Sequence, residues 1–351
     1  MRKLYLLLCL TALMFGIGHA DDLSSKLSNV ASSYATGYLQ PLSDAFGADI
    51  NSGFFHSAKM TNGFHLYIGV KAFAATIPSA DQLFNLAYND SIHVDRMVDD
   101  PSNPGGPQIH VQHDFSTTLN GIGLPTIFGD DKVPGVLNGT VSFDTTLGGN
   151  VYHIPLTYQK TTIGGVGKIN YAPLAMPQVT LGTIMGTDFT LRLIPKTNIG
   201  DYGSVGFWGI GVRHSISQYL GGENAPVDIA AGFAIQRFTI TAHDTTGGVS
   251  NDYDLLKASA WLFNVEVSKS FSLLTLYGGL QMEKASMDIQ YFYNAEVNGT
   301  TVKFNPAFSL DAKNTFRAIV GVNFALGPIN INADYNMGST TVISGGFGLA
   351  F

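Results

Sequence analysis

Seven charged residues stand at alternate positions of segments that otherwise have the composition of β-strands. On an extended chain, alternate side chains point to the same face, so these charges share the face opposite their apolar neighbours. Such a set could line a pore or bind a ligand, and its mixed sign predicts no strong selectivity for anions or cations. The alternative is that the charges pair across the interior and close it. The candidate lumen-lining residues are Lys71, Arg192, Arg213, Glu266, Glu283, Arg317 and Asp334.

Two other groupings could do chemistry, but their spacing argues against both. His110 and His113 are three residues apart, and on a strand they point to opposite faces, which is poor geometry for a shared metal ion. His214 and Ser215 are adjacent and diverge on a strand, so they do not form a nucleophile with its base. We therefore predict no enzyme, no metal site and no cofactor, and a lipid-modifying enzyme is only the third-ranked alternative.

The segments that carry these charges repeat every two residues. Near the end of the chain, Ile329, Ile331 and Tyr335 alternate with polar residues such as Asn332 and Asp334. A soluble sheet would bury the apolar face, whereas a membrane barrel turns it to lipid and the polar face to a wet interior. The repeat alone does not separate the two. The last such segment ends on Phe351, and this terminal aromatic residue resembles the assembly signal of bacterial outer-membrane barrels.

Composition favours an exported membrane barrel. Charged residues make up 13% of the chain, against roughly 25% in soluble domains. Arg2 and Lys3 followed by the apolar run Leu4–Ile17 predict a secretory signal peptide, and the only cysteine, Cys9, lies inside it. Without Arg2 and Lys3, 17 basic residues remain against 26 acidic ones, a net charge of −9 that argues against a nucleic-acid partner. We expect tryptophans and tyrosines at strand ends to anchor the barrel at the membrane surfaces.

The connections between the predicted strands differ at the two ends. Short turns fall at the end where Phe351 lies, and most long loops fall at the other, which is typical of outer-membrane barrels. Counting the segments predicts about fourteen strands, with the amino terminus at the short-turn end. Residues from Asp22 to about Gly47 have apolar residues at helical spacing and are predicted to form one or two short helices before the barrel.

A barrel of about fourteen strands with a helical amino-terminal segment resembles the long-chain fatty-acid transporter (FadL-type) family of outer-membrane channels. In that family the segment folds into the barrel as a hatch, and hydrophobic molecules pass from an outer site through a kink in the wall. The resemblance makes Asn51, Phe54 and Phe55 the candidate hatch residues. The family hatch usually carries Asn-Pro-Ala, and here the stretch Asn51–Phe55 lacks the Pro-Ala.

Three phrases are also similar to an uncharacterised outer-membrane family common in Bacteroidetes-like bacteria. They are Met176–Thr183, Gly211–Tyr219 and Asn330–Tyr335. This resemblance implies a barrel and a lineage, and it implies no activity.

The sequence thus predicts an all-β protein of the bacterial outer membrane. Residues 1–20 are the predicted signal peptide, 21–60 a helical hatch, and 61–351 a transmembrane antiparallel β-barrel of about 14 strands. The predicted function is a passive channel for small hydrophobic or amphipathic molecules, with outer-membrane lipid as its surroundings. The alternative is a barrel without transport that serves as an envelope scaffold or a surface-binding protein.

Overall fold

A computed structural model describes most of the chain: residues 20–60, 63–98, 105–106, 109–147, 150–183, 185–199, 203–221, 225–244, 251–291, 293–297, 300–304 and 306–351. The predicted signal peptide lies outside the described residues, except for Ala20. The chain divides into two compact units. The barrel unit comprises Leu39–Pro78, Ile169–Tyr293 and Asn305–Phe351, and the extension unit comprises Met1–Tyr38, Ser79–Lys168 and Asn294–Phe304.

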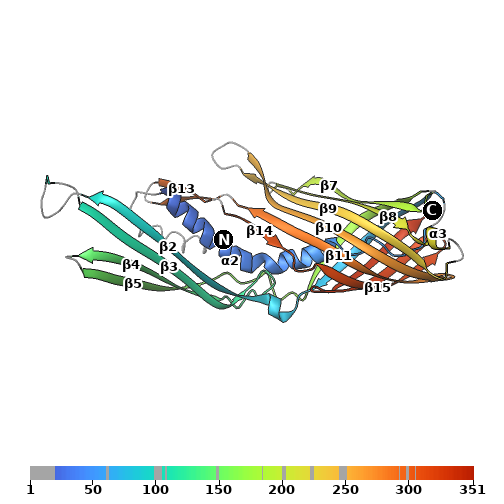
Figure 1. Ribbon diagram of the computed structural model, residues 1–351, viewed down its shortest axis with the longest axis horizontal. Coiled ribbons are helices and arrows are strands. Elements are labelled where there is room, and N and C mark those ends of the chain that lie inside the picture. Colours follow the sequence, from blue (N-terminus) through green and yellow to red (C-terminus); the bar gives the residue numbers. More distant parts are fainter. Residues whose placement is uncertain are drawn as a thin grey trace. The chain divides into compact units, whose positions relative to one another are not determined.

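The barrel unit contains a closed ring of ten antiparallel strands (Figure 1). They are β1 (His65–Thr76), β6 (Tyr171–Gly182), β7 (Thr187–Asn198), β8 (Gly203–Ser215), β9 (Asp228–Asp244), β10 (Asn251–Phe271), β11 (Leu274–Gln290), β15 (Phe316–Leu326), β16 (Ile329–Gly338) and β17 (Val342–Ala350). Neighbours follow the order β10-β9-β8-β7-β6-β1-β17-β16-β15-β11, and β11 pairs with β10 to close the ring. A short helix α3 (Ser217–Leu220) follows β8, and a short strand β14 (Ala307–Asp311) pairs with the end of β11.

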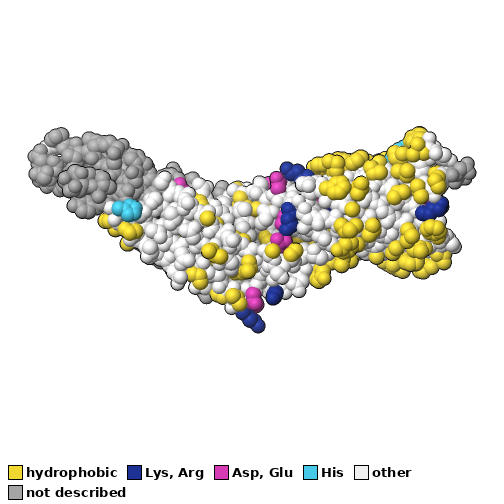
Figure 2. Space-filling view, turned by 60° about the horizontal axis from the view of Figure 1, so that its bottom comes forward, with side chains coloured by type: hydrophobic (Ala, Val, Ile, Leu, Met, Phe, Trp, Pro, Cys, Tyr) yellow, Lys and Arg dark blue, Asp and Glu magenta, His cyan; other side chains and the backbone are white. Residues whose placement is uncertain are grey.

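The barrel strands place apolar side chains outside and polar side chains inside. Along β1, Val70 is 51% exposed, whereas its neighbour Lys71 is fully buried. Along β16, Ile331 and Tyr335 are exposed, whereas Asn332 is buried. Figure 2 shows hydrophobic side chains gathered over the barrel. We call this outward-facing apolar surface, to which Val70, Ile331 and Tyr335 belong, the apolar belt. This arrangement is the inverse of a soluble barrel and is the one that a barrel facing lipid adopts.

The predicted barrel is confirmed, but ten strands rather than about fourteen close it among the described residues. The predicted barrel range of 61–351 also includes a separate four-stranded sheet in the extension unit. Its strands are β2 (Leu83–Val98), β3 (Ile109–Pro125), β4 (Val136–Leu147) and β5 (Asn150–Thr161), preceded by the 3₁₀ helix η1 (Ser79–Gln82). A further pair, β12 (Tyr293–Val297) and β13 (Thr300–Phe304), forms a two-stranded sheet.

Helix α2 (Ala20–Ile50) is continuous and contains Pro41. In the extension unit, its Tyr34 packs among Leu86, Leu119 and Leu137 of the four-stranded sheet. Burial raises the pKa of the Tyr34 phenol to about 12. The apolar face of this sheet is therefore covered by a helix, as in a soluble domain, and not by lipid.

From Leu39 onward, α2 belongs to the barrel unit and runs into the barrel. Leu42 and Phe46 pack against a cluster that includes Leu310, at the end of the barrel far from the turns β10–β11 and β15–β16. After the helix, the backbone N–H of Ala58 donates to Ser268 Oγ, close to the β10–β11 turn, at 3.0 Å. The chain therefore enters at the long-loop end and crosses the lumen to the short-turn end. The first barrel strand, β1, begins at the short-turn end, where the Leu66 N–H donates to the Phe351 carbonyl at 2.9 Å.

The wall of the barrel is incompletely paired between β6 and β7. These strands pair over five residues only, Gln178–Gly182 with Asp188–Arg192. Towards the long-loop end, β6 still pairs with β1 and β7 still pairs with β8, but their facing edges are not paired with each other. We call this unpaired stretch, Tyr171–Pro177 with Leu193–Asn198, the β6–β7 seam.

Three prolines lie in the seam. Pro173 and Pro177 are on β6, and Pro195 is on β7 beside a register shift. Because proline has no N–H and is tolerated on strand edges, each one removes a donor that a closed wall would use. Two prolines in a strand pattern argue against a fully paired strand.

Candidate functional site: the barrel lumen

The end of α2 and the residues after it fill the lumen, and we call residues 44–58 the plug. A helix leaves its last four carbonyls without partners inside the helix. Here the Gly47 carbonyl accepts from the Asn51 N–H at 3.4 Å, and the Asp49 carbonyl accepts from the Ser52 N–H at 3.0 Å. The remaining two, at Ala48 and Ile50, are satisfied by the barrel wall. The wall therefore caps the helix.

Arg192 of β7 supplies one of these caps. Its guanidinium donates to the carbonyl oxygens of Ile50 at 3.0 Å and Ser52 at 2.9 Å, and to Gln178 Oε1 at 3.0 Å. It also lies 3.9 Å from the ring centre of Phe54, in cation–π contact. Arg192 is fully buried, so the negative end of the helix dipole and an aromatic face take the place of water around its charge.

Arg317 of β15 supplies the second cap. It donates to the Ala48 carbonyl at 3.0 Å and to Ser52 Oγ. It also forms an ion pair with Glu283 of β11 at 2.5 Å, and both side chains are buried. The helix end is thus held between two arginines from different parts of the wall.

Arg213 of β8 holds the part of the plug that lies nearer the short-turn end. It donates to the Ser57 carbonyl oxygen, pairs with Asp188 at 2.5 Å, and lies 3.6 Å from Glu266. Its guanidinium is also 5.2 Å from the ring centre of Phe55. Arg213 therefore connects the plug to two carboxylates of the wall.

The other predicted lumen residues bind within the wall. Lys71 donates to Asn332 Oδ1 at 2.5 Å. Asp334 accepts from the Tyr277 hydroxyl at 2.9 Å and from Ser344 Oγ at 2.5 Å. The structure therefore places all seven predicted lining residues inside the barrel, where they bind the plug or other residues of the wall.

Several uncharged residues that hold the plug were missed. Gln281 donates to the Asn51 carbonyl at 2.9 Å, Gln236 donates to Asn51 Oδ1 at 3.0 Å, and Gln178 donates to the Phe54 carbonyl at 3.3 Å. Gln236 and Gln281 alternate with apolar residues in the sequence, so the face of the strand that each occupies can be predicted. A glutamine on a polar face gives no sign of its partner, however, because many polar residues share that face.

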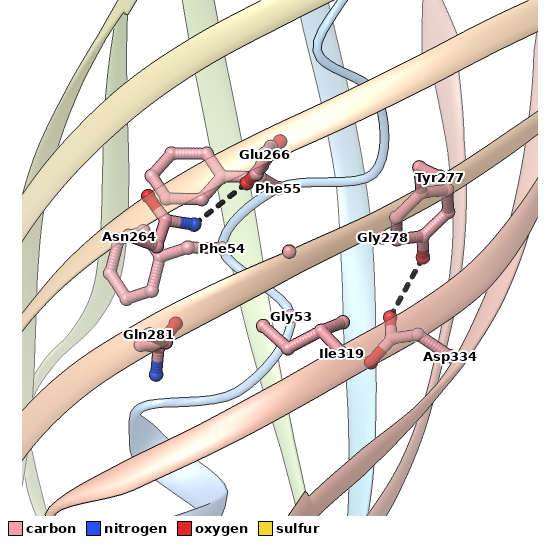
Figure 3. A pocket seen from close by; sticks show the side chains of 11 residues that line it. Gly53, Phe54, Phe55, Asn264, Glu266, Tyr277, Gly278, Gln281, Ile319 and Asp334 are labelled. Atoms are coloured by element: carbon pink, nitrogen blue, oxygen red, sulfur yellow. Dashed lines mark hydrogen bonds between the residues drawn. The ribbon is translucent and has the colours of Figure 1, made fainter.

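The three candidate hatch residues lie inside the barrel. Asn51 is 1% exposed, and Phe54 and Phe55 pack against Ala234 and Leu262 of the wall. Figure 3 shows Phe54 and Phe55 beside a small cavity that also contacts Tyr277 and Asp334. The cavity has a volume of about 10 Å³, which holds about one water molecule.

Towards the long-loop end, part of the inner face of the barrel, near β6 and β7, is apolar. Phe73, Met176 and Phe207 point inward and are at most 3% exposed. Leu174 and Ile194 lie on the inner faces of the two strands that border the β6–β7 seam, and both are half-buried. We call these five residues the apolar zone. The lumen thus has a polar level that binds the plug and an apolar level beside the seam.

The remaining candidates are the pairs His110 with His113 and His214 with Ser215. The side chains of His110 and His113 lie outside the described residues. His214 binds the Thr187 hydroxyl at 2.8 Å and Tyr219 at 3.0 Å, and its neighbour Ser215 does not contact its ring. In the part of the chain that the structure describes, no three His, Cys, Asp or Glu residues are grouped to hold a metal ion, and no helix has the length and apolar character needed to cross a membrane.

The chain is similar in structure to several outer-membrane proteins. The β domain of the Bordetella autotransporter BrkA is 10% identical, with a TM-score of 0.30 over 82% of this chain and 99% of that one. OmpF of Salmonella typhi, solved with daunomycin, is 10% identical, with a TM-score of 0.24 over 84% and 99%. The translocator domain of NalP from Neisseria meningitidis is 8% identical, with a TM-score of 0.21 over 92% and 97%.

No curated protein matches the chain. One family model matches residues 1–351, and its description is a family of unknown function, DUF6588.

Proposed function

The chain belongs to the DUF6588 family, whose function is unknown, so its role has to be inferred from its own structure. We propose that it is a bacterial outer-membrane barrel through which small hydrophobic or amphipathic molecules pass passively. The observation that carries the proposal is the β6–β7 seam, an unpaired stretch of wall with the apolar zone behind it. The proposal includes export by a cleaved signal peptide over residues 1–20.

The apolar belt supports insertion into a membrane. Exposed Trp261, Phe263, Val265 and Val267 follow one another on the outer face of β10. Tilted strands of about ten residues span the hydrocarbon layer of a membrane. A soluble barrel with such a surface would expose far more apolar area than monomeric proteins tolerate.

The route that we propose leaves the lumen sideways. Straight passage would have to displace the plug and break the contacts of Arg192, Arg213 and Arg317. The apolar zone lies on the long-loop side of Arg192, and the seam begins beside it. A hydrophobic molecule could therefore move from the apolar zone to the belt without crossing the charged level.

The two family resemblances remain proposals. A plug formed by an amino-terminal segment supports the similarity to FadL-type channels, with Phe54 and Phe55 in the hatch. The route differs from the kink of that family, because here it lies at unpaired strand edges. The similarity to the Bacteroidetes-like family implies a lineage only.

Uptake by proteoliposomes tests the proposal. The full chain is reconstituted, and entry of a pyrene-labelled fatty acid is followed by fluorescence. Ala172, on the inner face of β6 in the seam, is changed to Trp to fill the route. The matched control is Ala318→Trp, which adds the same side chain to the lipid-facing surface of β15. We expect Ala172→Trp to lower uptake to the level of empty liposomes and Ala318→Trp to leave it unchanged. Equal uptake by all samples, empty liposomes included, would reject passage through the seam.

A second function, an envelope scaffold or surface-binding barrel without transport, is favoured by the tightly held plug. A disulfide tests whether the plug has to move. A Cβ built on Gly47 would lie 2.8 Å from the Ala312 Cβ, within about 1 Å of the usual disulfide spacing. On the lateral route, oxidised Gly47→Cys/Ala312→Cys protein still takes up the probe. On a route through the lumen, uptake stops until a reductant is added, and a scaffold shows no uptake in either state.

A further inference from the structure

Basic residues gather at one edge of the apolar belt and on one side of the barrel. Arg237 of β9, Lys257 of β10 and Lys284 of β11 share the outward faces of strands that carry the belt. Lys196 lies exposed near the long-loop end of β7. On β15, β16, β17, β1 and β6, by contrast, the described residues include no outward-facing Lys or Arg. Figure 2 shows charged side chains at the edge of the hydrophobic surface.

The strand register places both tryptophans of the chain next to this basic group. Arg237 pairs directly with Trp208 on β8, and Lys284 pairs directly with Trp261 on β10. Side chains of directly paired residues have Cβ atoms about 5 Å apart. Trp208 and Trp261 are each 39% exposed. Tryptophan at this position is typical of the layer where lipid headgroups meet the hydrocarbon.

The charges in this group are only partly neutralised. Lys257 pairs with Asp254 at 2.9 Å, and Lys284 pairs with Asp311 at 3.4 Å. Among the described residues, Arg237 has no carboxylate within 4.0 Å and Lys196 forms no ion pair, although Lys196 lies near enough to Asp254 to interact with its charge. Asp288 of β11 also pairs directly with Lys257 in the strand register, so three carboxylates offset the four cations and the group keeps a formal charge of +1.

We propose that Arg237, with Lys196, Lys257 and Trp208, binds the phosphate of a phosphorylated lipid in the membrane leaflet at the long-loop end. The inference rests on the proposed membrane location. A guanidinium without a carboxylate partner can bind phosphate through two parallel hydrogen bonds. The indole of Trp208 lies at the depth where the acyl chains begin. The ligand is a lipid because the basic patch borders the apolar belt, so phosphate and acyl chains are bound by adjoining surfaces.

Native mass spectrometry of the full chain in detergent micelles tests this proposal. Lipid A, a phosphorylated glucosamine lipid, is the probe, phosphatidylcholine is the uncharged comparison, and inorganic phosphate is the competitor. The variant is Arg237→Gln/Lys196→Gln, and Arg237→Lys keeps the charge without the paired donors. The matched control is Lys132→Gln, an exposed lysine of the extension unit.

We expect the double variant to weaken lipid A binding about tenfold, the loss of one charged hydrogen-bonded contact, and Lys132→Gln to change nothing. Arg237→Lys should bind with intermediate affinity. Equal affinity of the double variant and the unchanged protein would overturn the proposal. Displacement of lipid A by millimolar inorganic phosphate would also overturn it, because the site would then recognise a free anion.

A separate measurement distinguishes this failure from failure of the proposed membrane location. The same samples are mixed with phosphatidylcholine vesicles and floated on a density gradient. Insertion into these vesicles without preference for lipid A rejects the lipid site alone. Absence from the vesicles rejects the membrane barrel itself, and the lipid site with it.

Discussion

Arg192→Ala should release the plug from the wall. In the folded barrel, this side chain satisfies the carbonyls of Ile50 and Ser52 and covers the ring of Phe54. Arg192 is fully buried, and no residue in the last turn of α2 is basic, so the helix itself offers no substitute donor. Alanine would leave both carbonyls without a partner in an interior that holds little water.

The size of the effect follows from these contacts. Leaving a buried carbonyl unsatisfied costs about 1–3 kcal/mol, so two carbonyls cost roughly 2–6 kcal/mol. Removing the arginine also removes the cost of burying its charge, which offsets part of this loss. A net weakening of about 2–4 kcal/mol raises the population with a released plug roughly 30- to 700-fold, since every 1.4 kcal/mol is a factor of ten.

Thiol labelling measures that population. The only natural cysteine, Cys9, lies in the predicted signal peptide, so Ala58→Cys can report on the plug alone. Ala58 is fully buried, and its reaction with a maleimide should require release of the plug. We expect labelling to speed up by the factor above in Arg192→Ala, and by less in Arg192→Lys, which can reach fewer acceptors. Arg237→Ala, at an exposed arginine of β9, is the matched control.

The reasoning would be refuted by a labelling rate in Arg192→Ala within twofold of the control, in a barrel that is still folded by circular dichroism. Such a result would mean that Arg317 and Arg213 hold the plug without help. The contributions of the arginines to holding the plug would then not be additive, and the contacts of Arg192 with Ile50, Ser52 and Phe54 would be dispensable.

Three further predictions concern the barrel in liposomes; urea unfolding measures the two substitutions, and the folded yield measures the deletion. Gly53→Ala should destabilise it by roughly 1–2 kcal/mol, because Gly53 has φ of +63° and an added Cβ would lie 2.7 Å from the Phe73 ring; an unchanged midpoint would contradict this. Deleting Phe351 should lower the folded yield, since its backbone forms two hydrogen bonds with Leu66 that close the ring. Full yield would show that β1 and β17 pair without these two hydrogen bonds. Val70→Arg should destabilise the barrel by roughly 2–4 kcal/mol if Val70 faces the middle of the membrane, and a much smaller cost would place it near the surface.

The inward and outward faces of the barrel strands could be predicted from the sequence. Period-two alternation is a local property, so Lys71, Arg192 and Asp334 were placed on the polar face without knowledge of their neighbours. The number of barrel strands could not be predicted. The same alternation occurs in the four-stranded sheet, where Leu119 and Leu137 face a helix instead of lipid. Whether a helix or lipid covers an apolar face depends on the tertiary structure, and the two-residue repeat is the same in the barrel and in the four-stranded sheet.

The role of the charges depended on information that the alternation does not contain. A charged residue in the lumen lines a pore if it faces water, and it caps a helix if it faces free helix carbonyls. The role of Arg317 therefore depends on where α2 ends. The sequence around Ile50 marks that end only weakly. The β6–β7 seam has a clearer sign in the sequence than the role of the charges. Pro173, Pro177 and Pro195 lie near one another in the sheet, and each was a sign of an edge that cannot be fully paired.

On the proposed function, the plug and the seam together determine which molecules cross this barrel. Ions need a continuous wet path, and the charged level around Arg192 and Arg213 is filled by the plug, with a cavity of about 10 Å³ beside it. Hydrophobic molecules do not need water and lose little by passing from Leu174 and Ile194 into the lipid. A barrel built in this way should therefore take up hydrophobic probes while remaining electrically silent in a planar bilayer. Steady ion conductance by the unmodified protein would show that the plug leaves the lumen, and the lateral route would no longer be required.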